Sequence, residues 1–101
     1  MGEWTRIAKT DEVSPGNGIT VEAGGKCLAV FNVDGAFHVT DNMCLHRGGP
    51  LGEGDLDGET VTCPWHGWEY NVKTGHCVSN PSSHVKAYEA VVEEGDIKIE
   101  L

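Results

Sequence analysis

Two short segments of the chain each pair a cysteine with a histidine. Cys44 precedes His46 with one residue between them, Cys63 precedes His66 with two, and sixteen residues separate His46 from Cys63. Thiolate sulfur and imidazole nitrogen are soft to borderline ligands, and they hold transition metals and iron–sulfur clusters. These four side chains are therefore the candidates for chemistry in this sequence.

Three kinds of site could use this quartet. A structural zinc site accepts two Cys and two His, but it usually pairs Cys with Cys and His with His along the chain. A Cys nucleophile with a His base would use only one of the two pairs. A [2Fe–2S] centre in which two Cys bind one iron and two His bind the other would use all four residues.

The residues around the quartet resemble a known family. Residues 44–51 read CLHRGGPL and residues 63–70 read CPWHGWEY, and both segments are similar to the ligand loops of Rieske iron–sulfur proteins. The resemblance is sharpest over residues 41–81. It implies a single Rieske domain over residues 1–101, with one [2Fe–2S] cluster per chain and a cluster-binding subdomain at about 41–81.

In this family each ligand loop supplies one ligand to each iron. The resemblance therefore implies that Cys44 and Cys63 bind the inner iron, and that His46 and His66 bind the outer, more exposed iron. With neutral imidazoles the oxidised cluster has no net charge, because the two ferric ions balance two sulfides and two thiolates. A neutral centre accepts an electron more readily than a dianion does, and reduction should couple to imidazole protonation at high pH.

Two differences separate the sequence from the Rieske proteins of respiratory and photosynthetic complexes. Those proteins carry an extra Cys in each ligand loop and join the two in a disulfide, whereas this chain has Leu45, Gly49 and Trp65 there. They also carry a Ser two residues after the second His ligand, where this chain has Trp68, although Tyr70 is kept. Fewer donors to the cluster sulfurs predict a reduction potential toward the low end of the Rieske range of roughly −150 to +300 mV.

The elements that must position these loops read as β-strands. Apolar, β-branched and aromatic runs predict strands at residues 4–8, 19–23, 26–33, 36–40, 85–92 and 97–101. Asp34 and Gly35 predict a tight hairpin, because both central positions of the favoured turn need a positive φ. The predicted class is all-β, and the resemblance makes it a Rieske-like antiparallel β-sandwich with an inserted cluster-binding subdomain.

A glycine-rich stretch interrupts these strands at residues 41–81. Only two short strands are predicted inside it, at residues 59–62 and 68–70. Glycine-rich sequence makes poor core material and favours loops, which carry many functional sites. In Rieske proteins a third, proline-bearing loop covers the cluster, and Asn80 with Pro81 stands where that loop is expected.

The remaining cysteines and histidines have ordinary structural interpretations. Cys27 lies in an apolar run and is expected to be a small buried thiol. Cys77, beside His76, is expected to be packed or half-buried, because the proposed cluster needs no further ligand. His38 and His84 are expected to face solvent or to be hydrogen-bonded.

Length and charge exclude several functions. The 101 residues carry sixteen acidic and seven basic side chains, which gives a formal net charge of −9. A chain of this length forms one modest core, with no room for the mononuclear iron domain of an oxygenase. The sequence also has no phosphate loop for flavin or nicotinamide. Scattered Lys and Arg argue against nucleic acid, and the chain lacks an apolar run long enough for a membrane span. A cytoplasmic monomer is therefore expected.

These observations predict an electron-transfer component and not an enzyme. The pattern is similar to the ferredoxins of ring-hydroxylating dioxygenase systems. That similarity implies a soluble one-electron carrier that passes electrons from a flavin-dependent reductase to a terminal oxygenase. The acidic surface would steer the carrier to basic patches on both partners in transient docking. The alternative is the small subunit of an assimilatory nitrite reductase, which shares this fold.

Overall fold

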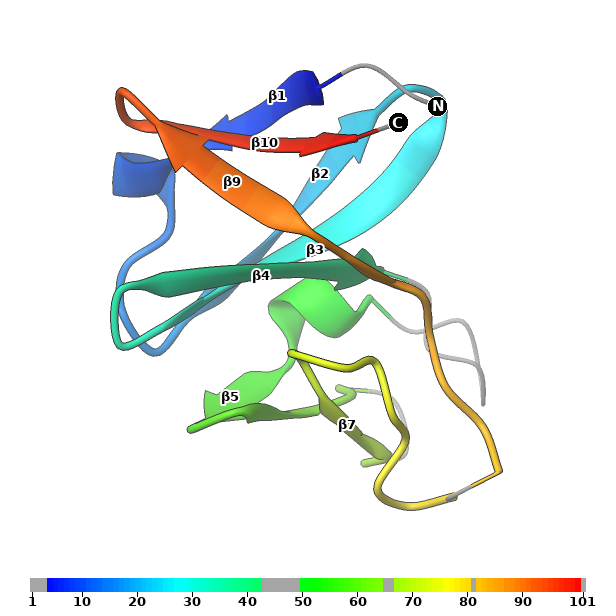
Figure 1. Cartoon of the computed structure of the whole chain (residues 1–101). Coiled ribbons are helices and arrows are strands. Elements are labelled where there is room, and N and C mark those ends of the chain that lie inside the picture. Colours follow the sequence, from blue (N-terminus) through cyan, green and yellow to red (C-terminus); the bar gives the residue numbers. More distant parts are fainter. Residues whose placement is uncertain (1–3, 43–49, 65–66, 81, 101) are drawn as a thin grey trace.

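The computed structural model describes residues 4–42, 50–64, 67–80 and 82–100 (Figure 1). These residues form three antiparallel sheets, together with two short 3-10 helices, η1 at Thr10–Glu12 and η2 at Leu51–Glu53. The strands are β1 Trp4–Lys9, β2 Gly18–Ala23, β3 Lys26–Val33, β4 Ala36–Asp41, β5 Asp55–Asp57, β6 Thr60–Thr62, β7 Glu69–Asn71, β8 Ala87–Tyr88, β9 Ala90–Glu93 and β10 Asp96–Glu100. The predicted all-β class is confirmed.

Two of the sheets form a sandwich. The first sheet has the order β1-β10-β9, and the second has the order β2-β3-β4-β8. In Figure 1 the first sheet lies above the second. The side chains buried between them come from both sheets and include Leu28, Val30, Val39, Ile97 and Ile99. In β10 the buried isoleucines alternate with Lys98 and Glu100, which is the pattern of a half-buried strand.

The third sheet lies on the other side of the second sheet. Its order is β5-β6-β7, and Figure 1 shows it at the bottom of the molecule. Its inward side chains pack with residues of β3 and of η2 in a second buried cluster, whose members include Phe31, Leu51, Val61, Tyr70 and Val85. The molecule therefore has two hydrophobic cores, one on each side of the second sheet.

Strand β3 is buried on both faces. Leu28 and Val30 belong to the core of the sandwich, whereas Ala29 and Phe31 belong to the core between the second and third sheets. All four have a relative exposure of 0%. A strand covered on both sides reads as a continuous apolar run and not as an alternating one, which explains the sequence of residues 26–33.

The predicted hairpin between β3 and β4 is confirmed. Asp34 and Gly35 have φ values of 50° and 92°, and Val33 pairs with Ala36 across the turn. Two successive positive φ angles are the signature of the type I′ turn, whose twist matches that of the flanking strands. The hairpin between β9 and β10 repeats this geometry, with φ values of 52° and 80° at its two central residues.

The prediction of one strand over residues 85–92 is wrong. The chain forms β8, which pairs with β4 in the second sheet, and then β9, which pairs with β10 in the first. Glu89 lies between them, where the chain crosses from one sheet to the other. The segment is apolar because it contributes to both sheets, and the sequence does not reveal this change of partner.

The glycine-rich stretch contains one more strand than predicted. Strand β5 pairs with β6 through Leu56 and Val61, while Asp55 and Asp57 on either side of Leu56 are exposed. Two carboxylates in three residues hide the strand from a prediction based on apolar content. In the described residues no helix is both long enough and apolar enough to cross a bilayer.

Candidate functional site

Asn42 closes the base of the first predicted ligand loop. Its carbonyl oxygen accepts a hydrogen bond of 2.7 Å from Leu51 N–H, so the chain leaves the sandwich and returns at one point. Its side-chain Oδ1 accepts hydrogen bonds from Gly52 N–H at 2.7 Å and from Thr20 Oγ1 at 3.2 Å. The Asn42 residue is 6% exposed. This buried amide therefore anchors both ends of the loop to β2.

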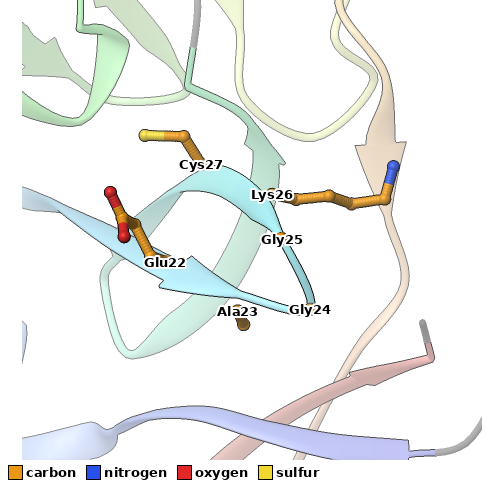
Figure 2. Close-up of a pocket in the computed structure, with 6 residues that line it drawn as sticks. All are labelled: Glu22, Ala23, Gly24, Gly25, Lys26 and Cys27. Carbon is orange, nitrogen blue, oxygen red and sulfur yellow. The ribbon is translucent and has the colours of Figure 1, made fainter.

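A third side-chain contact of Asn42 reaches Cys27. Asn42 Nδ2 lies 3.4 Å from Cys27 Sγ, and Asn42 N–H donates to Cys27 O at 3.1 Å. Cys27 is exposed, so the prediction of a buried thiol is wrong. The buried part of β3 begins only at Leu28, and Cys27 lines a shallow pocket at the β2–β3 turn (Figure 2).

The second predicted ligand loop is closed in a similar way. Cys63 follows β6 directly, and its N–H donates to Trp68 O at 2.7 Å. Gly67 has a φ of 73°, a left-handed conformation that suits glycine, where the chain turns back toward β7. Cys63 and Tyr70 are each 1% exposed and share the core between the second and third sheets. The loop therefore presents its cysteine from a rigid, buried position.

The chain after β7 pairs again with the third sheet. The proline-bearing loop expected at Asn80 and Pro81 stays a prediction, because Pro81 lies outside the described residues. Tyr70 pairs with Cys77, and His76 pairs with His84, in two antiparallel bridges. Cys77 is 0% exposed, which confirms the prediction of a packed thiol, and His84 is exposed as expected. Cys77 is therefore paired with β7 of the third sheet, and His84 is paired with His76 beside it.

Strand β8 and the residue before it are hydrogen-bonded to Asp41, which precedes Asn42. Tyr88 Oη donates to Asp41 Oδ1 at 2.7 Å, and Asp41 N–H donates to Lys86 O at 2.9 Å. Burial raises the pKa of Tyr88 to about 12, and the hydrogen bond and charge of Asp41 act in the same direction. The Tyr88 hydroxyl therefore stays protonated and keeps β8 fastened to the end of β4.

The surroundings of Cys63 fit its predicted role as a ligand of a [2Fe–2S] cluster. Cys63 is the one predicted ligand within the described residues, since Cys44, His46 and His66 lie outside them. Its sulfur belongs to a buried, apolar environment beside Tyr70, which suits a thiolate that is neutralised by a metal centre. Among the described residues no group of three or more Cys, His, Asp or Glu could hold a metal ion by itself.

His38 is half-buried on β4 and faces charged groups of the third sheet. Burial lowers the pKa of His38 from its ordinary value of 6.5, the positive charge of Lys73 lowers it further, and Glu59 acts in the opposite direction. Lys73 and Glu59 form an exposed ion pair with an N–O distance of 3.4 Å. This ion pair joins the β5–β6 turn to the segment after β7.

Replacing His38 by Gln is expected to reduce the loss of stability in mild acid. Its pKa is lower in the folded chain, so the unfolded chain binds the proton first as the pH falls below 6.5. The stability that this group contributes is thus present above the unfolded-state pKa and is lost as the pH falls through the folded-state pKa. Thermal unfolding at about pH 7.5 and about pH 5.5 measures the effect. An equal fall of Tm in His38→Gln and in the natural chain would contradict it.

Family comparison identifies the class of protein. The chain belongs to the Rieske [2Fe-2S] domain family, which it matches over residues 3–89. Membership of this family brings the [2Fe–2S] cluster as the cofactor of the chain.

The individual relatives include ferredoxins. The ferredoxin component of the p-cumate 2,3-dioxygenase system of Pseudomonas putida is 35% identical over 98 residues, which cover 94% of this chain and 83% of the relative. The structure of the Sphingomonas yanoikuyae B1 ferredoxin superposes with a TM-score of 0.90 at 33% identity and covers 98% of this chain and 99% of that chain.

A third relative is a ferredoxin seen together with its oxygenase. It comes from a complex of reduced oxygenase and oxidized ferredoxin in carbazole 1,9a-dioxygenase. The superposition has a TM-score of 0.86 at 33% identity and covers 96% of this chain and 92% of that chain.

Proposed function

We propose that this chain carries single electrons from a flavin-dependent reductase to a terminal oxygenase and has no substrate site of its own. The observation that carries the proposal is the match, over nearly the whole chain, to ferredoxin components of dioxygenase systems. One of those ferredoxins forms a complex with its oxygenase. A bound [2Fe–2S] cluster supplies the chemistry, because it accepts and releases one electron at a time.

The proposed ligands are the four residues singled out by the sequence. Cys44 and Cys63 would bind the inner iron, and His46 and His66 the outer iron. The burial of Cys63 at the end of β6 supports its assignment to an inner position. Asn42, whose carbonyl and side chain fix the base of the first loop, would set where that loop begins.

The proposed domain organisation is one Rieske domain over residues 1–101 with a cluster-binding subdomain at about 41–81. The third sheet and the closed bases of both ligand loops fall inside these limits. The separate core between the second and third sheets supports this division.

Reconstitution of electron transfer is the experiment that tests the carrier role. The purified protein should be red-brown, should bleach with dithionite and should support product formation only when reductase and oxygenase are both present. A nitrite reductase small subunit would instead copurify with a large nitrite-reducing partner and would fail to support the oxygenase. A colourless protein that contains zinc would contradict both roles.

The reduction potential is expected toward the low end of the Rieske range of roughly −150 to +300 mV. Trp68 is half-buried at the position where high-potential relatives place a Ser, and an indole offers no hydroxyl to a bridging sulfide. Protein-film voltammetry of the purified protein measures the potential. A value near the top of the range would contradict the argument from missing hydrogen-bond donors.

The chain is further proposed to act in the cytoplasm as a monomer and to dock only transiently with its reductase and oxygenase. It is proposed to bind neither nucleic acid nor membranes. The outer face of the third sheet supports a basic partner, because Asp55, Asp57 and Glu69 are exposed on it. The rate of reduction by the reductase is therefore expected to fall about tenfold as salt rises from low to physiological concentration. Stopped-flow kinetics at several salt concentrations measure this rate, and a rate independent of salt would contradict electrostatic steering.

A further inference from the structure

Two histidines that are not among the cluster ligands lie directly opposite each other. His76 and His84 form an isolated antiparallel bridge. One backbone hydrogen bond on each side of the pair, at 3.1 and 2.8 Å, joins the two paired segments. Neither bond involves His76 or His84. In such a non-hydrogen-bonded pair the opposed Cα atoms are only about 4.5 Å apart, and the side chains approach more closely than at any other position of a ladder.

Both imidazoles lie on the outer face of this ribbon. Their neighbours Cys77 and Val85 are 0% and 3% exposed and face the core, so the alternation of a β-strand sends His76 and His84 the other way. Both histidines are exposed. The backbones are also in close contact, because a Cβ at Gly75 would collide with Val85 O. The pair is therefore rigid, adjacent and open to solvent.

The charged neighbours of the pair have other partners. Lys86, two residues after His84, places its Nζ over the Tyr88 ring, 4.9 Å from the ring centroid. Lys73 pairs with Glu59. Both ammonium groups therefore have an interaction partner outside the histidine pair, so neither needs to occupy the space between the two imidazoles.

We propose that His76 and His84 form a surface binding site for one divalent transition-metal cation such as Cu²⁺, Ni²⁺ or Zn²⁺. Neutral imidazole is a ligand that suits these ions, and two imidazoles that face each other can bind one ion together. No third Cys, His, Asp or Glu completes the set among the described residues, so water would fill the remaining positions. The bound cation would join the two ends of the segment between the histidines and stabilise the folded chain by mass action.

Retention on immobilised Ni²⁺ tests the pair directly. The untagged protein with its cluster is expected to bind the column, whereas His76→Asn and His84→Asn are each expected to elute early. Calorimetric titration with Zn²⁺ should show an affinity lower by about tenfold or more in each variant, because one imidazole replaces a chelating pair. The visible spectrum of the cluster shows that each variant is folded.

A matched control variant distinguishes the effect of the His76–His84 pair from the effect of the number of histidines in the chain. The double variant Glu89→His with His84→Asn keeps five histidines but moves one to an exposed position away from His76. It is expected to bind Zn²⁺ as weakly as His84→Asn alone, and Zn²⁺ should raise the Tm of the natural chain only. Equal binding by the natural chain and by His76→Asn would overturn the proposal, as would full recovery of binding in the double variant.

Discussion

Replacement of Cys44, His46, Cys63 or His66 by Ala, one at a time, is expected to abolish the visible absorption of the [2Fe–2S] cluster. Each residue is proposed to supply one of two protein ligands to its iron, and an iron that keeps a single protein ligand is not retained. Iron and acid-labile sulfide per chain should fall by more than about tenfold. Absorbance together with chemical analysis of the purified variants measures the loss.

Cys27→Ser is the matched control for the cysteine variants. Cys27 is exposed, and its sulfur accepts a hydrogen bond from Asn42 Nδ2, which a serine oxygen can also accept. The control variant is expected to keep a full cluster. The ligand assignment is contradicted if Cys44→Ala retains the cluster, or if Cys77→Ala loses it while Cys63→Ala does not.

Asn42→Ala is expected to destabilise the protein and to lower cluster occupancy even in the folded fraction. The substitution leaves the Gly52 N–H without its 2.7 Å partner in a buried place and removes the contacts to Thr20 and Cys27. An unsatisfied buried donor costs about 1–3 kcal/mol. A loss of this size should lower the Tm of a chain of this length by about 10 °C. Thermal unfolding and the iron content of the folded protein measure the two effects separately.

Asn32→Ala provides the comparison that isolates loop anchoring. Asn32 is 4% exposed, its Nδ2 donates to Val13 O at 2.8 Å, and its Oδ1 accepts from Gly35 N–H at 2.7 Å. Its contacts therefore stabilise the β3–β4 hairpin and the segment after η1, and not a ligand loop. A similar fall in Tm with a full cluster is expected. Equal loss of the cluster in both variants would show that Asn42 acts through global stability alone.

The sequence predicts the strands well where burial determines the residue types. The limits of β3 at Lys26–Val33 match the prediction, because a strand buried on both faces has a continuous apolar run that turn residues bound on each side. The Asp34-Gly35 turn also matches, since few other dipeptides tolerate two positive φ angles. Local physics is sufficient in both cases.

Features that depend on contacts distant in sequence were not predictable. The role of Asn42 rests on partners in β2, β3 and η2, and an isolated Asn after a strand gives no sign of them. The exposure of Cys27 depends on the point at which neighbouring elements begin to bury β3. Residues 85–92 divide into two strands because these strands pair in two different sheets. For the candidate site, residue types, spacing and the family resemblance name four ligands, of which the described residues include only Cys63, whereas the anchors of the loops emerge only from the fold.

The burial of β3 on both faces has a consequence for how the molecule unfolds. Since Leu28 and Phe31 contribute to different cores, β3 cannot separate from either core without damage to the other. The subdomain and the sandwich should therefore open together as one cooperative unit, and the backbone amides of β3 should be among the last to exchange with solvent. The part of the molecule that is proposed to hold the cluster is therefore protected from local opening by β3, a strand that contributes no ligand.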